Sequence, residues 1–263
     1  MGTGKCGSTL LFFRIKNSFS REHTGIFEPR QFEDIRKQYD PGSVLITKAL
    51  ILDAIPFLGE INNFFNKKIL IVRDPRDVYI SALLYTGGYH FIWEKSPEEI
   101  LNFIDLLITK EQQPSSISLL EMFRCIWAPF ELDVFSEKIS NQLDIAISLA
   151  KQRGFFVVKY EDLINNDLNE LENYLGFEIT KYNEVDEEFS RVVRSKGSGF
   201  WKDWYLNEDI VFFRPLLSET IEVFGYHSEW ATNSHPAILK EHCSEYVKRI
   251  VNERRKQAGL VLI

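Results

Sequence analysis

Three short runs of apolar residues stand out along the chain. They are residues 43–46 (SVLI), 68–74 (KILIVRD) and 155–162 (FFVVKYED). Each run is rich in β-branched or aromatic residues, and none alternates between polar and apolar positions. This pattern is typical of strands that are buried on both faces of a parallel sheet. We therefore predict three buried strands.

Between these runs, apolar residues recur every three or four positions, which is the spacing of amphipathic helices. Pro75 suits the first turn of one helix, and Gly225 suits the end of another. The predicted helices cover residues 10–15, 76–85, 97–110, 118–130, 133–152, 219–226 and 236–258. The last of these forms a charged C-terminal helix.

Strands that alternate with helices predict an α/β fold in three layers, with a mostly parallel sheet between two layers of helices. We expect one such domain over residues 1–263. Ligands of these sheets bind beyond the carboxyl ends of the strands. The loops after residues 46, 72 and 160 should therefore share one edge of the sheet, which is where we look for chemistry.

Composition narrows the class of protein. The chain is 44% hydrophobic, enough for a packed core, and its net charge of −7 disfavours nucleic acid as a partner. Three scattered cysteines indicate a reducing compartment rather than a disulfide framework. No run approaches the roughly 20 apolar residues of a membrane span, and no secretion signal opens the chain. We expect a cytoplasmic protein that holds any anion in a local pocket.

The opening of the chain is such a pocket candidate. It combines two glycines, one lysine and two hydroxyl residues, namely Gly4, Lys5, Cys6, Gly7, Ser8 and Thr9. A glycine-rich turn before a helix exposes backbone N–H groups, and the helix dipole adds positive charge. The stretch predicts a site for phosphate or another tetrahedral anion; the alternative is an ordinary glycine and serine turn. It is not a Walker A loop, since Ser or Thr does not directly follow Lys5.

The order Lys-Cys-Gly-Ser-Thr resembles the Lys-Ser-Gly-Thr-Thr loop of sulfotransferases that use 3′-phosphoadenosine 5′-phosphosulfate (PAPS). In that family a β-strand precedes the loop, where this chain has residues 1–3 alone. The resemblance implies that the strand lies upstream or is absent, and we favour an upstream start.

A second segment, RDPRDVYIS (residues 73–81), is similar to the family's segment for the 3′-phosphate. Arg73 and Ser81 have the spacing of the family's arginine and serine. A guanidinium can bind two phosphate oxygens at once. The alternative is an ion pair of Arg73 with Asp74 or Asp77.

Two weaker matches follow in the family's order. RSKGSGFWKDW (residues 194–204) resembles the family's glycine loop, which places Arg194, Lys196 and Gly197 near the phosphate; otherwise it is a solvated basic loop. KYEDL (residues 159–163) resembles the segment whose tyrosine contacts adenine, which assigns that role to Tyr160. Residues 166–178 then look like the family's next helix.

The resemblance implies a P-loop-like sulfotransferase fold, PAPS as the donor, and sulfuryl transfer to a hydroxyl or amine. Lys5 would neutralise the bridging oxygen. The amides near Gly7, with Ser8 and Thr9, would hold the 5′-phosphate. The 3′-phosphate would contact Arg73, Ser81, Arg194 and Lys196. The scheme requires no metal, and the five histidines lack zinc-site spacing.

The acceptor base is open. Many cytosolic members carry Lys-Thr-His where this chain has TKALILD (residues 47–53). Lys48 matches, but Leu50 replaces the histidine. Glu28, Asp53 and His90 remain as candidates. Leu10 also stands where the family has a tryptophan that stacks on adenine.

Two other functions are open alternatives. One is a sulfotransferase-like protein without catalytic activity, and the other is a P-loop small-molecule kinase that uses ATP and Mg²⁺. Residues 86–130 carry many aromatic side chains that are candidates for an acceptor pocket. We favour carbohydrate as the acceptor because the histidine of the phenol- and steroid-type enzymes is missing. The oligomeric state is open.

Overall fold

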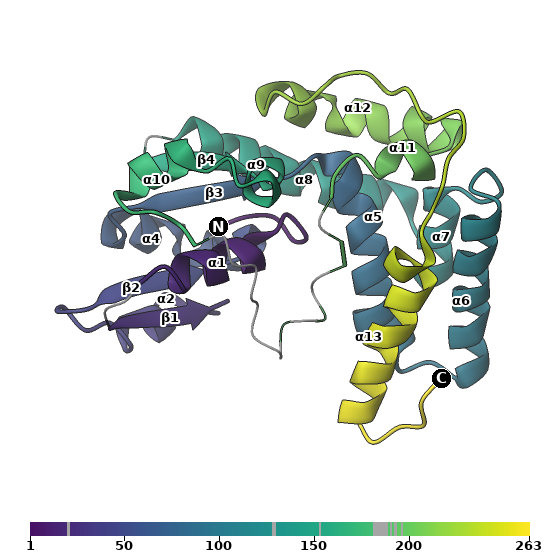
Figure 1. Cartoon of the computed structure of the whole chain (residues 1–263), viewed down its shortest axis with the longest axis horizontal. Coiled ribbons are helices and arrows are strands. Elements are labelled where there is room, and N and C mark those ends of the chain that lie inside the picture. The colour runs from purple at the N-terminus through teal and green to yellow at the C-terminus, as the bar shows by residue number, and fades with distance from the viewer. Residues whose placement is uncertain are drawn as a thin grey trace. The chain divides into compact units, whose positions relative to one another are not determined.

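The structure is a computed structural model of the whole chain (Figure 1). It describes all residues except 20, 21, 128, 129, 153, 181–188, 190, 192, 193 and 196. The chain divides into two compact units, each made of two stretches. Unit 1 comprises Met1–Arg73 and Ser140–Ser190, and unit 2 comprises Asp74–Ile139 and Arg191–Ile263.

Unit 1 contains two pairs of parallel strands. One pair is β1 (His23–Phe27) with β2 (Val44–Lys48), and the other is β3 (Lys68–Val72) with β4 (Phe155–Lys159). The predicted strands correspond to β2, β3 and β4, so the parallel α/β class is confirmed. β1 was not predicted, because Gly25 interrupts its five residues and gives no apolar run. The three-layer P-loop arrangement remains a prediction.

The first two residues lie between these two pairs of strands. Gly2 forms isolated parallel bridges to Leu50 and to Ile71. The N–H of Ile71 donates to the Met1 carbonyl at 2.9 Å, and the N–H of Ile51 donates to the Gly2 carbonyl at 3.0 Å. A side chain at residue 2 has no room, since a Cβ there would lie 2.4 Å from the Cys6 Sγ. Residues 1 and 2 therefore act as one short strand position between β2 and β3.

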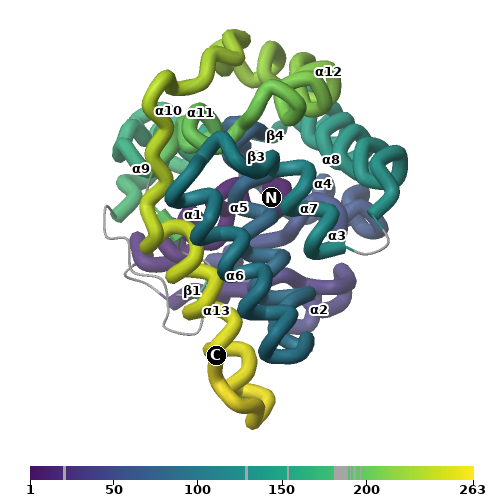
Figure 2. Tube along the Cα trace, turned by 90° about the vertical axis from the view of Figure 1, so that its right-hand side faces the viewer, coloured from purple at the N-terminus to yellow at the C-terminus, as the bar shows by residue number. Residues whose placement is uncertain are grey.

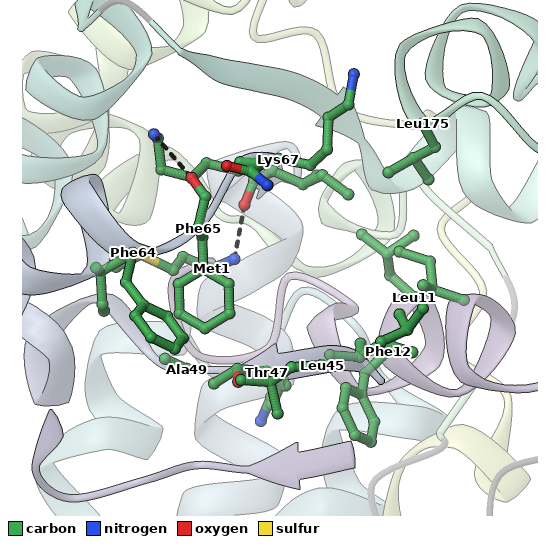
Figure 3. A pocket seen from close by; sticks show the side chains of 18 of the residues that line it. Met1, Leu11, Phe12, Leu45, Thr47, Ala49, Phe64, Phe65, Lys67 and Leu175 are labelled. Atoms are coloured by element: carbon green, nitrogen blue, oxygen red, sulfur yellow. Dashed lines mark hydrogen bonds between the residues drawn. The ribbon is translucent and has the colours of Figure 1, made fainter. Parts of the chain in front are cut away.

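A cavity of about 570 Å³ opens beside Met1, lined by side chains from α1, β2, β3 and the end of α4 (Figure 3). Its lining is mainly apolar and includes Leu11, Phe12, Leu45, Phe64 and Phe65. The buried hydroxyl of Thr47 has no hydrogen-bond partner among the described residues. The Met1 amino group donates to the Ile69 carbonyl at 2.6 Å, and burial lowers its pKa to about 6.

Short helices surround the strands of unit 1. They are α1 (Ser8–Lys16), α2 (Phe32–Arg36), α3 (Ile51–Ala54), α4 (Leu58–Phe64), α9 (Tyr160–Asn165) and α10 (Asn169–Leu175), with a 3₁₀ turn at Ile55–Phe57. Two separate clusters of buried side chains form the core. The first joins α1 to β3 and β4 through Leu11, Ile15, Ile71 and Val158. The second lies around Ile26, Ile35, Ala49 and Phe57.

Unit 2 is helical. It contains α5 (Pro75–Thr86), a π-helical turn (Gly87–Ile92), α6 (Pro97–Gln112), α7 (Leu119–Ile126), α11 (Trp201–Trp204), α12 (Asn207–Val223), a 3₁₀ turn (Lys240–His242) and α13 (Ser244–Gln257). α8 (Leu132–Lys151) runs from unit 2 into unit 1. α13 packs against α5 and α6, and Figure 2 shows α6 and α13 side by side.

The predicted helices are present, with three differences at their ends. The helix predicted at residues 118–130 ends at Ile126. The one predicted at 219–226 is the last part of α12, which ends at Val223 just before Gly225 with its φ of +64°. The C-terminal helix begins at Ser244 instead of residue 236. Within the described ranges, none of the helices combines the length and apolar composition needed to cross a bilayer.

The cavity beside Met1 predicts a gain in stability when an extended segment fills it. We expect a chain with about five additional residues, alternating valine and isoleucine and joined to Met1, to melt about 3–6 °C higher. Each buried apolar side chain contributes roughly 1.5–3 kcal/mol before its entropic cost. Differential scanning calorimetry measures the shift. The control is an extension of glycine and serine of equal length, and equal melting temperatures for the two would contradict the prediction.

Candidate anion-binding site

The turn before α1 has an unusual backbone. Lys5 and Gly7 both adopt left-handed conformations, with φ of +66° and +91°. For a residue other than glycine this costs roughly 1–2 kcal/mol, and such strain is typical of ligand-binding turns. Gly7 is the N-cap of α1 and has no side chain to cap the amides of the first turn. The turn therefore leads into the positive end of the α1 dipole, which favours an anion, and the binding of an anion there stays a prediction.

Arg73 and Tyr160 meet this turn. Arg73 directly follows β3, and its Nη1 donates to the Lys5 carbonyl at 3.4 Å. Its guanidinium carbon lies 4.5 Å from the centre of the Tyr160 ring. Gly7 packs on the same ring, because a Cβ at this position would lie 2.3 Å from the Tyr160 Cδ2. Three segments that are far apart in the sequence thus form one cluster within unit 1.

The side chains of this cluster differ in what they can offer a ligand. Cys6 is fully buried, its thiol donates to the Thr3 carbonyl at 2.8 Å, and burial raises its pKa. Cys6 can therefore contribute only backbone groups. Ser8 and Thr9 are buried at 8% and 7% exposure, in the first turn of α1. Tyr160 is 6% exposed, and its adenine contact remains a prediction.

An ion pair lies at the carboxyl ends of β1 and β2. The Lys48 ammonium, on a side chain that is 5% exposed, donates to the Glu28 carboxylate. The Glu28 N–H donates back to the Lys48 carbonyl at 2.7 Å, and Glu28 has a left-handed φ of +50°. Burial lowers the pKa of Lys48, and the hydrogen bond that Lys48 donates to Glu28 offsets only part of this shift. Lys48 also lines the cavity beside Met1, together with Ser8.

The three candidate bases occupy different surroundings. Glu28 has the strained backbone and the buried cationic partner just described. Asp53 is exposed in α3, and its charge raises the pKa of Lys48. His90 is exposed in the π-helical turn of unit 2, where its ring meets those of Tyr85 and Tyr89 edge-on at 5.6 and 5.2 Å. Glu28 thus combines a left-handed backbone with an ion pair to a buried lysine, and the identity of the base stays a prediction.

The remaining predicted residues belong to unit 2. Ser81 is buried in α5. The Nη1 of Arg194 donates to the His242 carbonyl at 3.2 Å, and its guanidinium carbon lies 5.1 Å from the Phe200 ring centre. Gly197 packs closely on Phe200, with 2.8 Å from an added Cβ to the ring. Lys196 lies outside the described residues. Their contacts with a 3′-phosphate remain predictions.

Two buried charged residues have contacts that the sequence did not predict: Arg76, to which it gave no role, and Asp77, which it named only as a possible partner of Arg73. Asp74 ion-pairs with Arg76 at 2.7 Å, and Asp77 accepts the backbone N–H groups of Gly199 and Trp201. The available signal was the density of charge in RDPRD at a helix start, where a proline fixes the first turn.

Among the described residues, no group of His, Cys, Asp and Glu side chains is arranged to hold a metal ion. Neither a protein-family model nor a curated protein sequence matches this chain.

The contact between Gly7 and Tyr160 predicts a selective cost of substitution. We expect Gly7→Ala to lower the free energy of unfolding by about 3 kcal/mol, from its left-handed φ and from overpacking on the ring. Urea denaturation measures this cost. Gly4→Ala is the matched control, because nothing lies within 4 Å of an added Cβ there. Similar values for the two variants would show that the ring does not constrain the turn.

Proposed function

We propose that this protein transfers a sulfuryl group from PAPS to a hydroxyl or amine acceptor. The observation that carries the proposal is the convergence on one cluster of Lys5, Arg73 and Tyr160. These residues come from three segments that each resemble a sulfotransferase motif, and the motifs occur in the family's order. A turn of this kind on its own would suit many anions.

The cluster has the chemistry that the donor requires. Backbone amides at the start of α1, with Ser8 and Thr9, supply neutral donors for a 5′-phosphate. Arg73 supplies a forked cation, which is held by the Tyr160 ring and by the Lys5 carbonyl before a ligand arrives. Ser81, Arg194, Lys196 and Gly197 keep the 3′-phosphate role that the resemblance assigns, and each can be tested by its own substitution.

Transfer needs a base and stabilisation of the leaving group. In the proposed step, the Glu28 carboxylate takes the proton of the acceptor as the acceptor atom forms a bond to sulfur. The bond from sulfur to the bridging oxygen breaks, and its electron pair leaves with adenosine 3′,5′-bisphosphate. Lys5 stabilises the charge that develops on that oxygen. Lys48 orients the carboxylate of Glu28 through the ion pair between them. We favour a carbohydrate acceptor.

The first prediction from this scheme concerns Lys5 and Arg73. Lys5→Ala should reduce transfer of labelled sulfate from PAPS by about 10²–10³-fold, the usual cost of losing one donor to developing charge. Arg73→Ala should chiefly weaken the binding of adenosine 3′,5′-bisphosphate, as measured by isothermal titration calorimetry. Lys16→Ala, at the other end of α1, is the control and should leave both quantities unchanged.

Three outcomes would contradict the assignment. Near-normal turnover by Lys5→Ala would remove the role of the turn in catalysis. Tighter binding of ATP with Mg²⁺ than of adenosine 3′,5′-bisphosphate would favour a kinase. Tight binding of the bisphosphate without transfer to hydroxyl or amine acceptors of several classes would favour a sulfotransferase-like protein that lacks activity.

The second prediction concerns the base. In the proposed step the Glu28 carboxylate accepts the proton of the acceptor, which an amide in its place cannot do. Glu28→Gln should therefore lower turnover about 100-fold. Asp53→Asn is the control and should retain turnover. Normal turnover in Glu28→Gln would transfer the role to another group.

A further inference from the structure

Asp77 lies in the first turn of α5 and is fully buried. Each of its carboxylate oxygens accepts a backbone N–H from one short segment of unit 2. Oδ2 accepts from Gly199 at 2.6 Å, and Oδ1 accepts from Trp201 at 2.9 Å. We call residues 197–201 the glycine segment. One carboxylate thus fixes this segment at two points that are separated by a single residue.

Arg76 contacts the same segment through the ring of Trp201. Its guanidinium carbon lies 4.0 Å from the centre of the Trp201 ring. The guanidinium also donates to both carboxylate oxygens of Asp74 and to the carbonyls of His227 and Glu229. Arg76 is therefore balanced by Asp74, while Asp77 is stabilised by the two amides and by the N-terminus of α5.

A carboxylate is a costly group to bury, and two amide hydrogen bonds are what make its burial tolerable. The two hydrogen bonds from the glycine segment to Asp77 restrict a flexible stretch of backbone. Gly197 and Gly199 leave its backbone with wide conformational freedom, and Gly199 adopts a left-handed φ of +80°. The two bonds from Asp77 select one conformation of a segment that would otherwise sample many.

We infer that Asp77 is a positioning residue, which holds the glycine segment and the adjoining Arg194 ready for a phosphate group. This inference rests on the proposed function, in which Arg194 and Gly197 contact the 3′-phosphate of the donor. Asp77 itself does not touch the ligand. It acts through the amides of Gly199 and Trp201.

Asp209 provides a matched control in the same unit. It is also fully buried, and its carboxylate accepts the N–H groups of Leu119, Leu120 and Leu206 at 3.0, 3.0 and 2.9 Å. These bonds join the start of α7 to the start of α12. Asp77→Asn and Asp209→Asn therefore remove comparable buried charges, but only the first changes the support of the glycine segment.

The test compares two nucleotides in the full chain by isothermal titration calorimetry. Asp77→Asn should weaken the binding of adenosine 3′,5′-bisphosphate by about tenfold to a hundredfold. It should leave the binding of adenosine 5′-monophosphate, which lacks the 3′-phosphate, unchanged. Asp209→Asn should change neither affinity, although both variants should melt at lower temperature. Equal loss for both nucleotides, or the same loss in Asp209→Asn, would overturn the inference.

Hydrogen–deuterium exchange gives a readout that does not depend on the ligand. The amides of Gly199 and Trp201 should exchange faster in Asp77→Asn than in the unsubstituted protein. Faster exchange with unchanged selectivity for the bisphosphate would overturn the inference and leave the proposed function intact. Failure of the unsubstituted protein to bind the bisphosphate would instead overturn the proposed function, and the positioning role with it.

A second variant covers the case in which Asp77→Asn does not fold. Gly199→Ala leaves Asp77 in place, and nothing lies within 4 Å of the added Cβ. The left-handed φ of residue 199 would nevertheless strain an alanine there and displace the segment. The same selective loss of affinity for the bisphosphate is expected. Unchanged selectivity in this variant would overturn the inference.

Discussion

The ring of Tyr160 is the surface on which the candidate site of unit 1 is built. Gly7 approaches it so closely that no side chain fits between them, and Arg73 lies over the ring at 4.5 Å. The ring therefore sets both the start of α1 and the position of a cation at the end of β3. Because Tyr160 directly follows β4, the pairing of β3 with β4 determines where these groups meet.

The sequence could predict those helices and strands that a local pattern of residues specifies. Continuous apolar runs identify β2, β3 and β4, and Pro75 marks the start of α5. The first part of α12 was missed because Pro215 lies inside it, and an internal proline argues against a helix. β1 was missed because its five residues carry no periodicity of their own. It is a strand because it pairs with β2, which is a tertiary effect.

In the candidate site, too, the parts that depend on local sequence could be predicted, and the parts that depend on tertiary contacts could not. Lys5 and Arg73 lie in short segments that the sequence singles out by their resemblance to known motifs, without knowledge of the fold. The ion pair of Glu28 with Lys48 requires β1 to lie beside β2, so a sequence pattern that omits β1 cannot contain it. The local sequence makes Asp77 a candidate partner of Arg73. In the structure, Asp77 instead accepts hydrogen bonds from the amides of Gly199 and Trp201, more than a hundred positions later. Such pairings depend on the folded topology and leave no local signal.

The division of unit 1 into two pairs of strands gives residues 1 and 2 a further importance. Among the described isolated bridges, Gly2 pairs with Leu50 after β2 on one side and with Ile71 of β3 on the other. Ile46 of β2 also packs against the hydrophobic cluster of β3 and β4. Helix α1 contacts β2 and shares its core with β3 and β4. The turn that precedes α1 therefore lies at the junction of the two pairs. A displacement of one pair against the other would move Lys48 and Glu28 relative to Lys5, so the catalytic geometry we propose depends on how firmly this junction is held.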